Sequence, residues 1–229
     1  MTNKQIPETS VLLSTFNNES TIKNSIESII DQTYEDFEFL IIDDASTDNT
    51  FKILNEFEDE RIYVFKNRTN IGLTKSLNFL IQKSEGKYLA RQDGDDLSFK
   101  DRLKIQREFI NQSKYQICSS RAINQSTQKK IPGYSHYLPE KLLFKFKNPH
   151  IHGTLFMEKS VIENIGGYDE NFYYAQDFKL YCDLKRRHID IKRLNRILYS
   201  LNTKNNISTN KKKTQKYYFD CAKNNVIPN

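Results

Sequence analysis

The chain has 229 residues, of which 28% are charged and 37% hydrophobic, and no apolar run approaches the roughly 20 residues that span a bilayer. These values predict one large globular domain, or two modest halves that share a core, and exclude a membrane-spanning protein. Residues 201–229 hold six lysines and one acid, +5 of the net charge of +6, which leaves +1 for the remaining residues. Since a nucleic-acid-binding protein would carry its basic surface on the folded body, nucleic acid is not an expected partner.

Cysteine usage and the N-terminus indicate the compartment. Cys118, Cys182 and Cys221 are an odd number at wide spacing, without a zinc or disulfide pattern. The first residues lack the apolar core of a secretory signal. We therefore expect a cytoplasmic protein.

Strand and helix patterns alternate through the first 112 residues. Short apolar runs predict strands over residues 11–15, 37–42, 61–65 and 87–92. Apolar residues at helical spacing predict a helix after each of them, beginning near residues 21, 48, 73 and 99. The alternation predicts an α/β fold: a mostly parallel, Rossmann-like central sheet with helices on both faces.

The second half is less regular. Strands are predicted over residues 115–118 and 153–157, and a helix over residues 175–187. We expect a single domain of two halves, residues 1–112 and 113–200, followed by a basic C-terminal tail (201–229).

Polar clusters follow three of the predicted strands, at residues 15–19, 43–46 and 93–96. Carboxyl ends of parallel strands meet at one edge of a sheet, and ligands bind outside that edge. The clusters therefore predict one binding site.

Asp93-Gly94-Asp95-Asp96 is the most informative of these clusters. Three carboxylates within four residues repel one another unless a positive charge lies among them. Mg²⁺ or Mn²⁺ suits such a set, because both prefer carboxylate oxygen and leave positions for phosphate and water. A solvated acidic turn that caps the next helix is the alternative.

The glycines exclude the common phosphate cradles. None of the seven forms a dinucleotide-binding or P-loop motif, so phosphates would be held through a metal. The second turn offers Asp44 to ribose hydroxyls or a base N–H. A helix cap is the other reading of this turn, and both roles coexist if Asp48 provides the cap.

The order of these motifs resembles that of family 2 glycosyltransferases, inverting enzymes of the glycosyltransferase A fold that use nucleotide-diphosphate sugars. The resemblance extends over roughly residues 9–190. Its motifs are Thr15-Phe16-Asn17, Asp43 to Asp48, Asn70-Ile71-Gly72, Asp93 to Asp96, His152-Gly153-Thr154, Gly166 to Glu170 and Gln176-Asp177.

The resemblance implies a role for each matched position. It implies that residues 1–112 bind the donor and that residues 113–200 bind the acceptor and carry the catalytic base. The residues implied to bind the nucleotide sugar are Thr15, Phe16, Asn17, Glu19, Asp44, Lys75, Arg91, Asp93, Gly94 and Asp95. Those implied to bind the acceptor are Gly166, Gly167, Tyr168 and Gln176. For Lys75 and Arg91 a solvated surface charge is the alternative. Asp95 would hold Mn²⁺ or Mg²⁺, with Asp93, Asp96 and His152 as further candidate ligands; a structural histidine is the alternative for His152.

Asp177 matches the catalytic base of the family. It would take the proton of an acceptor hydroxyl in a single inverting displacement. Family members usually have Glu before this Asp, whereas this chain has Gln176. An N-cap of the following helix is the alternative role for Asp177.

The expected acceptor is a glycan or a lipid-linked sugar, in bacterial surface polysaccharide or glycolipid synthesis. Residues 202–229 are basic with following aromatics, which indicates contact with an anionic membrane surface, at its inner face, or a solvated helix. The competing functions are an inactive nucleotide-sugar-binding module, a sugar nucleotidyltransferase, and nucleic-acid binding through the tail. The nucleotidyltransferase would be expected to carry a glycine-rich basic loop after its first strand, and residues 15–19 do not form one.

Overall fold

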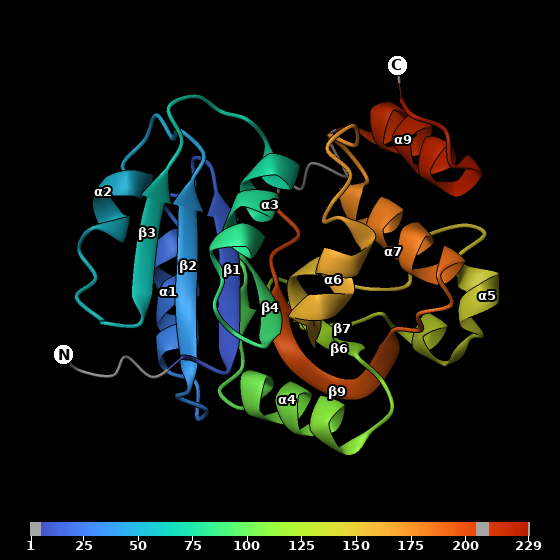
Figure 1. The fold of residues 1–229 in the computed structure, drawn as a ribbon, viewed down its shortest axis with the longest axis horizontal. Coiled ribbons are helices and arrows are strands. Elements are labelled where there is room, and N and C mark those ends of the chain that lie inside the picture. Colours follow the sequence, from blue (N-terminus) through green and yellow to red (C-terminus); the bar gives the residue numbers. More distant parts are fainter. Residues whose placement is uncertain (1–5, 205–210, 229) are drawn as a thin grey trace.

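The computed structural model describes residues 6–204 and 211–228. Its centre is a nine-stranded sheet in the order β3-β2-β1-β4-β8-β6-β9-β5, with β7 paired to β6 (Figure 1).

The strands are β1 (Thr9–Thr15), β2 (Phe37–Asp43), β3 (Ile62–Lys66), β4 (Tyr88–Asp93), β5 (Leu97–Ser98), β6 (Ile117–Asn124), β7 (Lys130–Ile131), β8 (Phe156–Glu158) and β9 (Lys192–Leu201). The α-helices are α1 (Ile22–Ile30), α2 (Thr50–Leu54), α3 (Leu73–Lys83), α4 (Arg102–Gln112), α5 (Glu140–Leu143), α6 (Lys159–Ile165), α7 (Gln176–Arg186) and α9 (Lys212–Asn224). Two 3₁₀ turns are η1 (Tyr134–Tyr137) and η2 (His152–Thr154).

The strand order creates a crevice between β1 and β4. The chain builds β1, β2 and β3 outward in parallel and then crosses back to place β4 on the other side of β1. In this register Ser14 lies opposite Asp93, and Thr15 lies opposite Asp43. The carboxyl ends of β1 and β4 therefore flank the point where strand order reverses, which is where open α/β sheets bind ligands.

The second half extends the sheet with a change of direction. β8 runs antiparallel to both β4 and β6, and β6 runs parallel to β9. Helices cover both faces, with α3, α6 and α7 against one core and α1 and α4 against the other. Successive residues of β1 alternate between these cores: Leu12 joins the first, and Val11 and Leu13 join the second. Burial on both faces explains why these strands are continuous apolar runs.

The predicted α/β fold is confirmed, and so are the four strands and four helices of the first half, within a few residues at their ends. In the second half the strand predicted over residues 153–157 is wrong at its start, because residues 152–154 form η2 and β8 begins only at Phe156. Gly153 packs against Asp93 and Tyr199, which turns the backbone away from the sheet there. The ten-residue strand β9 and helix α6 were not predicted.

The C-terminal region contains a packed helix. The ring of Phe219 on α9 stacks on Phe178 of α7 with centroids 3.8 Å apart, and Cys221 and Ala222 are buried against them. Residues 205–210 of the basic tail lie outside the described residues. No helix in the described parts of the chain is long and apolar enough to cross a membrane.

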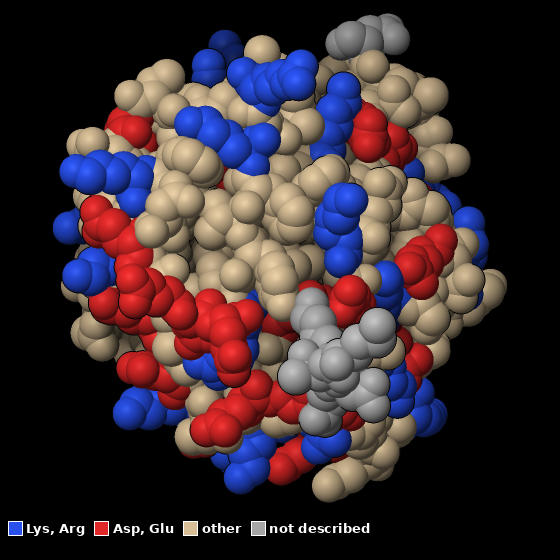
Figure 2. All heavy atoms as spheres, turned by 60° about the vertical axis from the view of Figure 1, so that its left-hand side comes forward, with Lys and Arg blue, Asp and Glu red and all other residues tan. Residues whose placement is uncertain are grey.

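Charge is unevenly distributed over the surface. On the face shown in Figure 2, acidic side chains gather in a broad band, with lysines and arginines above and below it.

Arg102, at the start of α4, is fully buried beneath the sheet edge. Its guanidinium donates to neutral acceptors: Gln106 Oε1 (3.0 Å), Gln92 Oε1 (3.1 Å), Ser98 Oγ (2.7 Å), the Arg91 carbonyl (2.5 Å) and the Leu155 carbonyl (3.4 Å). Burial lowers its pKa to about 10. One side chain thus connects α4, β4 and the segment before β8.

We predict that Arg102→Ala lowers the free energy of unfolding by about 3 kcal/mol or more, since it opens a cavity and leaves buried acceptors without donors. Lys104→Ala, at an exposed position of the same helix, should change it by less than about 0.5 kcal/mol. Urea denaturation of both variants measures the difference. Equal stabilities would contradict the structural role of Arg102.

Candidate active site

A cavity of about 1400 Å³ opens at the carboxyl ends of the parallel strands. Turns of the first half line one side of it, and residues 145–153, the start of α7 and part of α9 line the other. The predicted site residues on its wall are Thr15, Phe16, Asn17, Asp44, Asp93, Gly94, Asp95, Asp96, His152, Gln176 and Asp177. The predicted residues that are not among its lining are Glu19, Lys75, Arg91, Gly166, Gly167 and Tyr168.

Arg91 is a scaffold for the acidic turn. Its side chain is buried, and its guanidinium pairs with Asp93 Oδ1 at 2.5 Å and donates to the Leu12 carbonyl at 3.0 Å. This geometry corrects the expectation that Arg91 binds the nucleotide sugar, because its guanidinium is buried and forms an ion pair with Asp93. Lys75, an exposed residue of α3, also lies off the cavity wall.

Asp95 and Asp96 have unfavourable surroundings for negative charge. Burial and the neighbouring Asp93 raise the pKa of Asp95 to about 6. Burial, Asp93 and Asp95 raise the pKa of Asp96 to about 9, although Asp96 Oδ1 accepts a bond from the Asn202 amide at 2.6 Å. A cation in the cavity would relieve this repulsion.

The donor set fits a metal that is shared with a substrate. Within residues 6–204 and 211–228, no group of three or more His, Cys, Asp or Glu side chains is arranged to hold a metal ion. The predicted four-residue set is thus not a preformed cage. His152 Nε2 is hydrogen-bonded to the Tyr168 hydroxyl at 2.8 Å. Burial, and then the charge of Arg91, lower the pKa of His152 to about 3. Asp95, on the cavity wall, is the residue that could hold such an ion, for which phosphate oxygens and water would be further ligands.

An added side chain would clash at Gly153 and would be tightly packed at Gly94. A Cβ on Gly153 would lie 2.6 Å from Asp93 Oδ2 and 2.5 Å from the Tyr199 hydroxyl oxygen. A Cβ on Gly94 would lie 3.1 Å from Thr15 Oγ1. Since Tyr199 also accepts a bond from the Asp93 amide at 3.1 Å, β9 supports the acidic turn from below.

The first two turns are tied to each other. Asn17, at φ 53°, accepts a bond from the Thr47 amide through Oδ1 and donates its own amide to Ser46 Oγ, both at 2.9 Å. Glu19 accepts bonds from Asn49 at the start of α2, so it holds that helix rather than the cavity wall. Asp48 Oδ1 accepts the Thr50 amide at 2.9 Å, but the N-cap position of α2 is Asn49, so the cap expected at Asp48 is wrong by one residue.

Asp44 anchors the loop between β3 and α3. Its buried carboxylate accepts bonds from the side-chain amide of Asn67 (2.7 Å) and the backbone amides of Ile71 (3.0 Å) and Gly72 (2.8 Å). A carboxylate has about four acceptor positions. One position therefore stays available to a ligand in the cavity.

Asp177 enters the cavity from the opposite half. It lies in the first turn of α7, whose N-cap is Ala175, so the alternative N-cap role of Asp177 is wrong. Its carboxylate accepts a bond from the side-chain amide of Asn148. Burial raises its pKa, and the negative charge of Asp93 raises it further, which indicates that both carboxylates face the same space.

Three residues implied to bind the acceptor are structural. Gly166 ends α6 at φ 89°, and Gly167, at φ 86°, packs so closely on Asn78 that a Cβ would lie 2.7 Å from its Oδ1. The Tyr168 side chain is buried beside His152. Only Gln176 of this set reaches the cavity.

Sequence reasoning missed several residues of the site. Asn148, Tyr199 and Asn202 contact Asp177, Asp93 and Asp96 respectively. The available signal for Tyr199 and Asn202 was the short apolar run Ile197-Leu198-Tyr199, which is consistent with a buried strand followed by polar residues.

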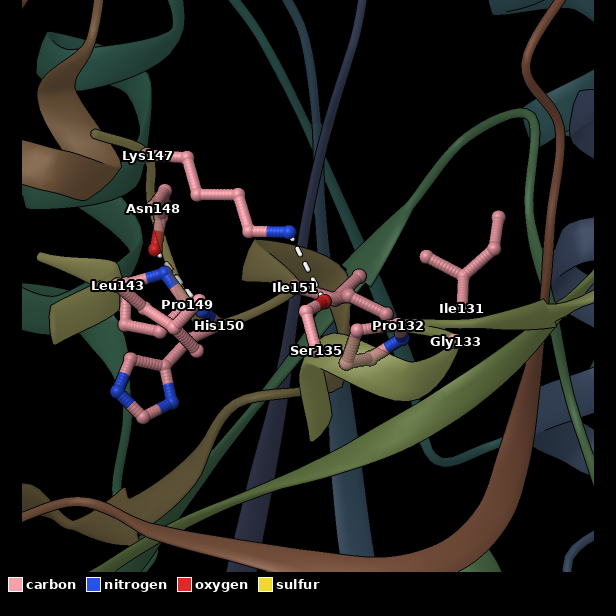
Figure 3. A pocket seen from close by; sticks show the side chains of 10 residues that line it. All are labelled: Ile131, Pro132, Gly133, Ser135, Leu143, Lys147, Asn148, Pro149, His150 and Ile151. Atoms are coloured by element: carbon pink, nitrogen blue, oxygen red, sulfur yellow. Dashed lines mark hydrogen bonds between the residues drawn. The ribbon is translucent and has the colours of Figure 1, made fainter. Parts of the chain in front are cut away.

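A smaller cavity of about 290 Å³ lies beside the large one (Figure 3). Both are lined by Lys147, Asn148, His150 and Ile151. The segment 147–151 therefore forms a wall between two spaces.

Several known proteins are similar to this chain. The chain is 35% identical over 171 residues to the "Putative glycosyltransferase EpsE" of Bacillus subtilis, an alignment that covers 71% of this chain and 60% of that protein. It is 31% identical over 132 residues to the Escherichia coli "UDP-Glc:alpha-D-GlcNAc-diphosphoundecaprenol beta-1,3-glucosyltransferase WfaP", covering 58% of this chain and 47% of that one. The chain thus spans about half to three fifths of these relatives.

Two solved structures share the fold. The S. aureus TarS fragment 1–349 in complex with UDP-GlcNAc superposes with a TM-score of 0.75 at 20% identity, over 87% of this chain and 59% of that chain. The Pyrobaculum calidifontis mannosyltransferase PcManGT, in complex with GDP-Man and Mn²⁺, gives a TM-score of 0.69 at 16% identity, over 86% and 57%. The model of the family described as "Glycosyl transferase family 2" matches residues 10–166, more than half of the length, and the chain belongs to that family.

Proposed function

We propose that the chain is an inverting glycosyltransferase that moves a sugar from a UDP-sugar to an acceptor hydroxyl, with Mn²⁺ or Mg²⁺ as its cofactor. The observation that carries the proposal is the placement of Asp95 and Asp177 on the wall of one cavity. A carboxylate that suits a metal–diphosphate and a carboxylate that suits proton transfer are the two groups that this reaction needs.

In this proposal the first half of the chain holds the donor. Thr15, Phe16 and Asn17 line the nucleotide pocket, Asp44 offers its remaining acceptor position to a base N–H, and Asp93 meets the ribose. A divalent ion on Asp95 would neutralise the diphosphate and make it a better leaving group. The UDP-GlcNAc bound to the TarS fragment and the UDP-Glc named for WfaP support the choice of a UDP-sugar.

Asp177 performs the proton transfer. The oxygen of the acceptor hydroxyl attacks the anomeric carbon of the donor sugar. The hydroxyl proton moves to the Asp177 carboxylate, and the bond between the anomeric carbon and the diphosphate breaks. One displacement inverts the anomeric centre, whereas retention through a covalent enzyme would require a second carboxylate as nucleophile. Gln176, beside the base, is proposed to contact the acceptor.

The proposed acceptor is a glycan or lipid-linked sugar, and the proposed setting is surface polysaccharide or glycolipid synthesis at the cytoplasmic face of the membrane. The diphosphoundecaprenol-linked acceptor named for WfaP supports this class. Membrane contact of the tail is proposed for the lysines of α9 and for the exposed side chains of Tyr217, Val226 and Ile227, whereas Phe219 is stacked within the protein.

We predict that a UDP-sugar with Mn²⁺ raises the melting temperature by about 5 °C or more at a hundredfold excess over Kd. Asp95→Asn should lose the metal-dependent part of this shift, because the amide carries no charge. Asp190→Asn, the same change at an exposed position, is the matched control. A thermal-shift screen of nucleotide sugars with and without metal measures this, and an unchanged shift in Asp95→Asn would contradict the metal assignment.

We predict that Asp177→Asn lowers turnover by about 10²-fold or more while UDP-sugar affinity stays within twofold, since general-base help contributes about 10²–10⁴-fold. UDP release, with water or a membrane lipid extract as acceptor, gives turnover, and calorimetry gives affinity. Asp183→Asn on the same helix, whose carboxylate pairs with Lys179 and Arg186, is the control with unchanged turnover. Full turnover in Asp177→Asn would exclude Asp177 as the base, and binding without turnover in the wild type would favour an inactive binding module.

A further inference from the structure

Asn148 lies on the wall between the two cavities and faces the proposed base. Its side-chain Nδ2 donates to Asp177 Oδ2. Its Oδ1 accepts the backbone amide of His150 at 3.0 Å (Figure 3). Because the backbone N–H can only donate, Oδ1 must be the end that faces His150. The amino group is thereby directed at the base.

The segment that carries Asn148 is anchored on both sides. Lys147 Nζ donates to Ser135 Oγ at 2.9 Å. The buried His150 ring bonds Ser119 Oγ through Nδ1 at 2.9 Å and packs edge-on to Tyr181, with centroids 4.9 Å apart. These contacts hold Asn148 in place although cavities lie on either side of the segment.

Among the described residues, no lysine, arginine or histidine is hydrogen-bonded to or ion-paired with Asp177, although Lys145, Lys204 and Lys216 line the same cavity. Asp93 on β4 opposes its charge, and Tyr168 and Tyr181 present phenols whose pKa burial raises, so both are neutral at pH 7. Lys147 of the wall bonds Ser135, and His152 is neutral. Besides the backbone amides at the start of α7, Asn148 is the group that favours the ionised carboxylate.

We infer that Asn148 is a positioning residue for Asp177: its amide fixes the orientation of the carboxylate and stabilises the ionised form that accepts the acceptor's proton. This inference rests on the proposed function only in calling Asp177 the base. The pairing itself has a readout that needs no substrate.

Removal of the hydrogen-bond donor, the side-chain amide of Asn148, should raise the pKa of Asp177. A hydrogen bond to a charged group stabilises it enough to correspond to about one to two pH units. In Asn148→Ala the acid limb of the kcat/KM profile should move to higher pH by that amount, because the base stays protonated longer. We expect kcat to fall about tenfold or more, with the KM for the UDP-sugar unchanged.

Two measurements test the inference. The ¹³C carboxyl shift of Asp177, assigned by its absence in Asp177→Asn, gives the pKa directly in protein labelled at aspartate. The pH profile of UDP release gives the kinetic consequence. The Asn148→Asp variant has nearly the same side-chain volume, lacks the hydrogen-bond donor and adds a negative charge. In this variant the pKa of Asp177 should rise further than in Asn148→Ala. It also tests the inference if Asn148→Ala folds poorly.

The matched control is Asn111→Ala, which loses a side-chain hydrogen bond to Tyr88 at the end of α4 and should leave the pKa of Asp177 unchanged. An unchanged Asp177 pKa in both Asn148 variants, or an equal rise in the control, overturns the inference whatever the turnover. A raised pKa in a protein that turns over no nucleotide sugar supports the pairing and refutes the proposed function instead.

Discussion

Two buried arginines beneath the acidic turn are the constraint on which the candidate site depends. Arg91 neutralises Asp93 from inside the protein, and Arg102 holds the carbonyl of Arg91 and the side chain of Gln92. Both guanidinium groups make their hydrogen bonds and ion pairs below the turn. Asp95 therefore lies on the cavity wall without a close positive partner among the residues that the structure describes, and burial and the charge of Asp93 raise its pKa. The arrangement leaves a negative site that an exogenous cation can fill.

The candidate site exists only where two halves of the chain meet. The acidic turn ends β4, whereas Asp177 enters on α7, whose apolar face packs into the same core as α3 and α6. Tyr199 on β9 and Gly153 in η2 close the base of the site around Asp93. Burial of α7 and β9 therefore sets the positions of the side chains that line the cavity. The packing contacts that stabilise the fold also position these side chains.

Much of the first half was predictable because its signals are local. A buried parallel strand is a short apolar run, and the polar residues that follow it must lie at the carboxyl edge. That reasoning correctly predicted that Thr15, Asp44 and Asp95 share one wall. It failed for β9, whose apolar residues are separated by charges, and for Asn148, whose role depends on a contact with a distant helix.

The amino-acid sequence by itself determined the α/β layout, the edge at which a ligand binds and the turns that line it, because apolar periodicity and chain direction set these. Only the tertiary structure decided which charged side chains face the cavity: Arg91 points inward, Glu19 holds α2, and Tyr168 is buried beside His152. The reason is physical, since a buried charge or hydroxyl turns toward whichever partner the packing provides, and those partners come from segments far away along the chain.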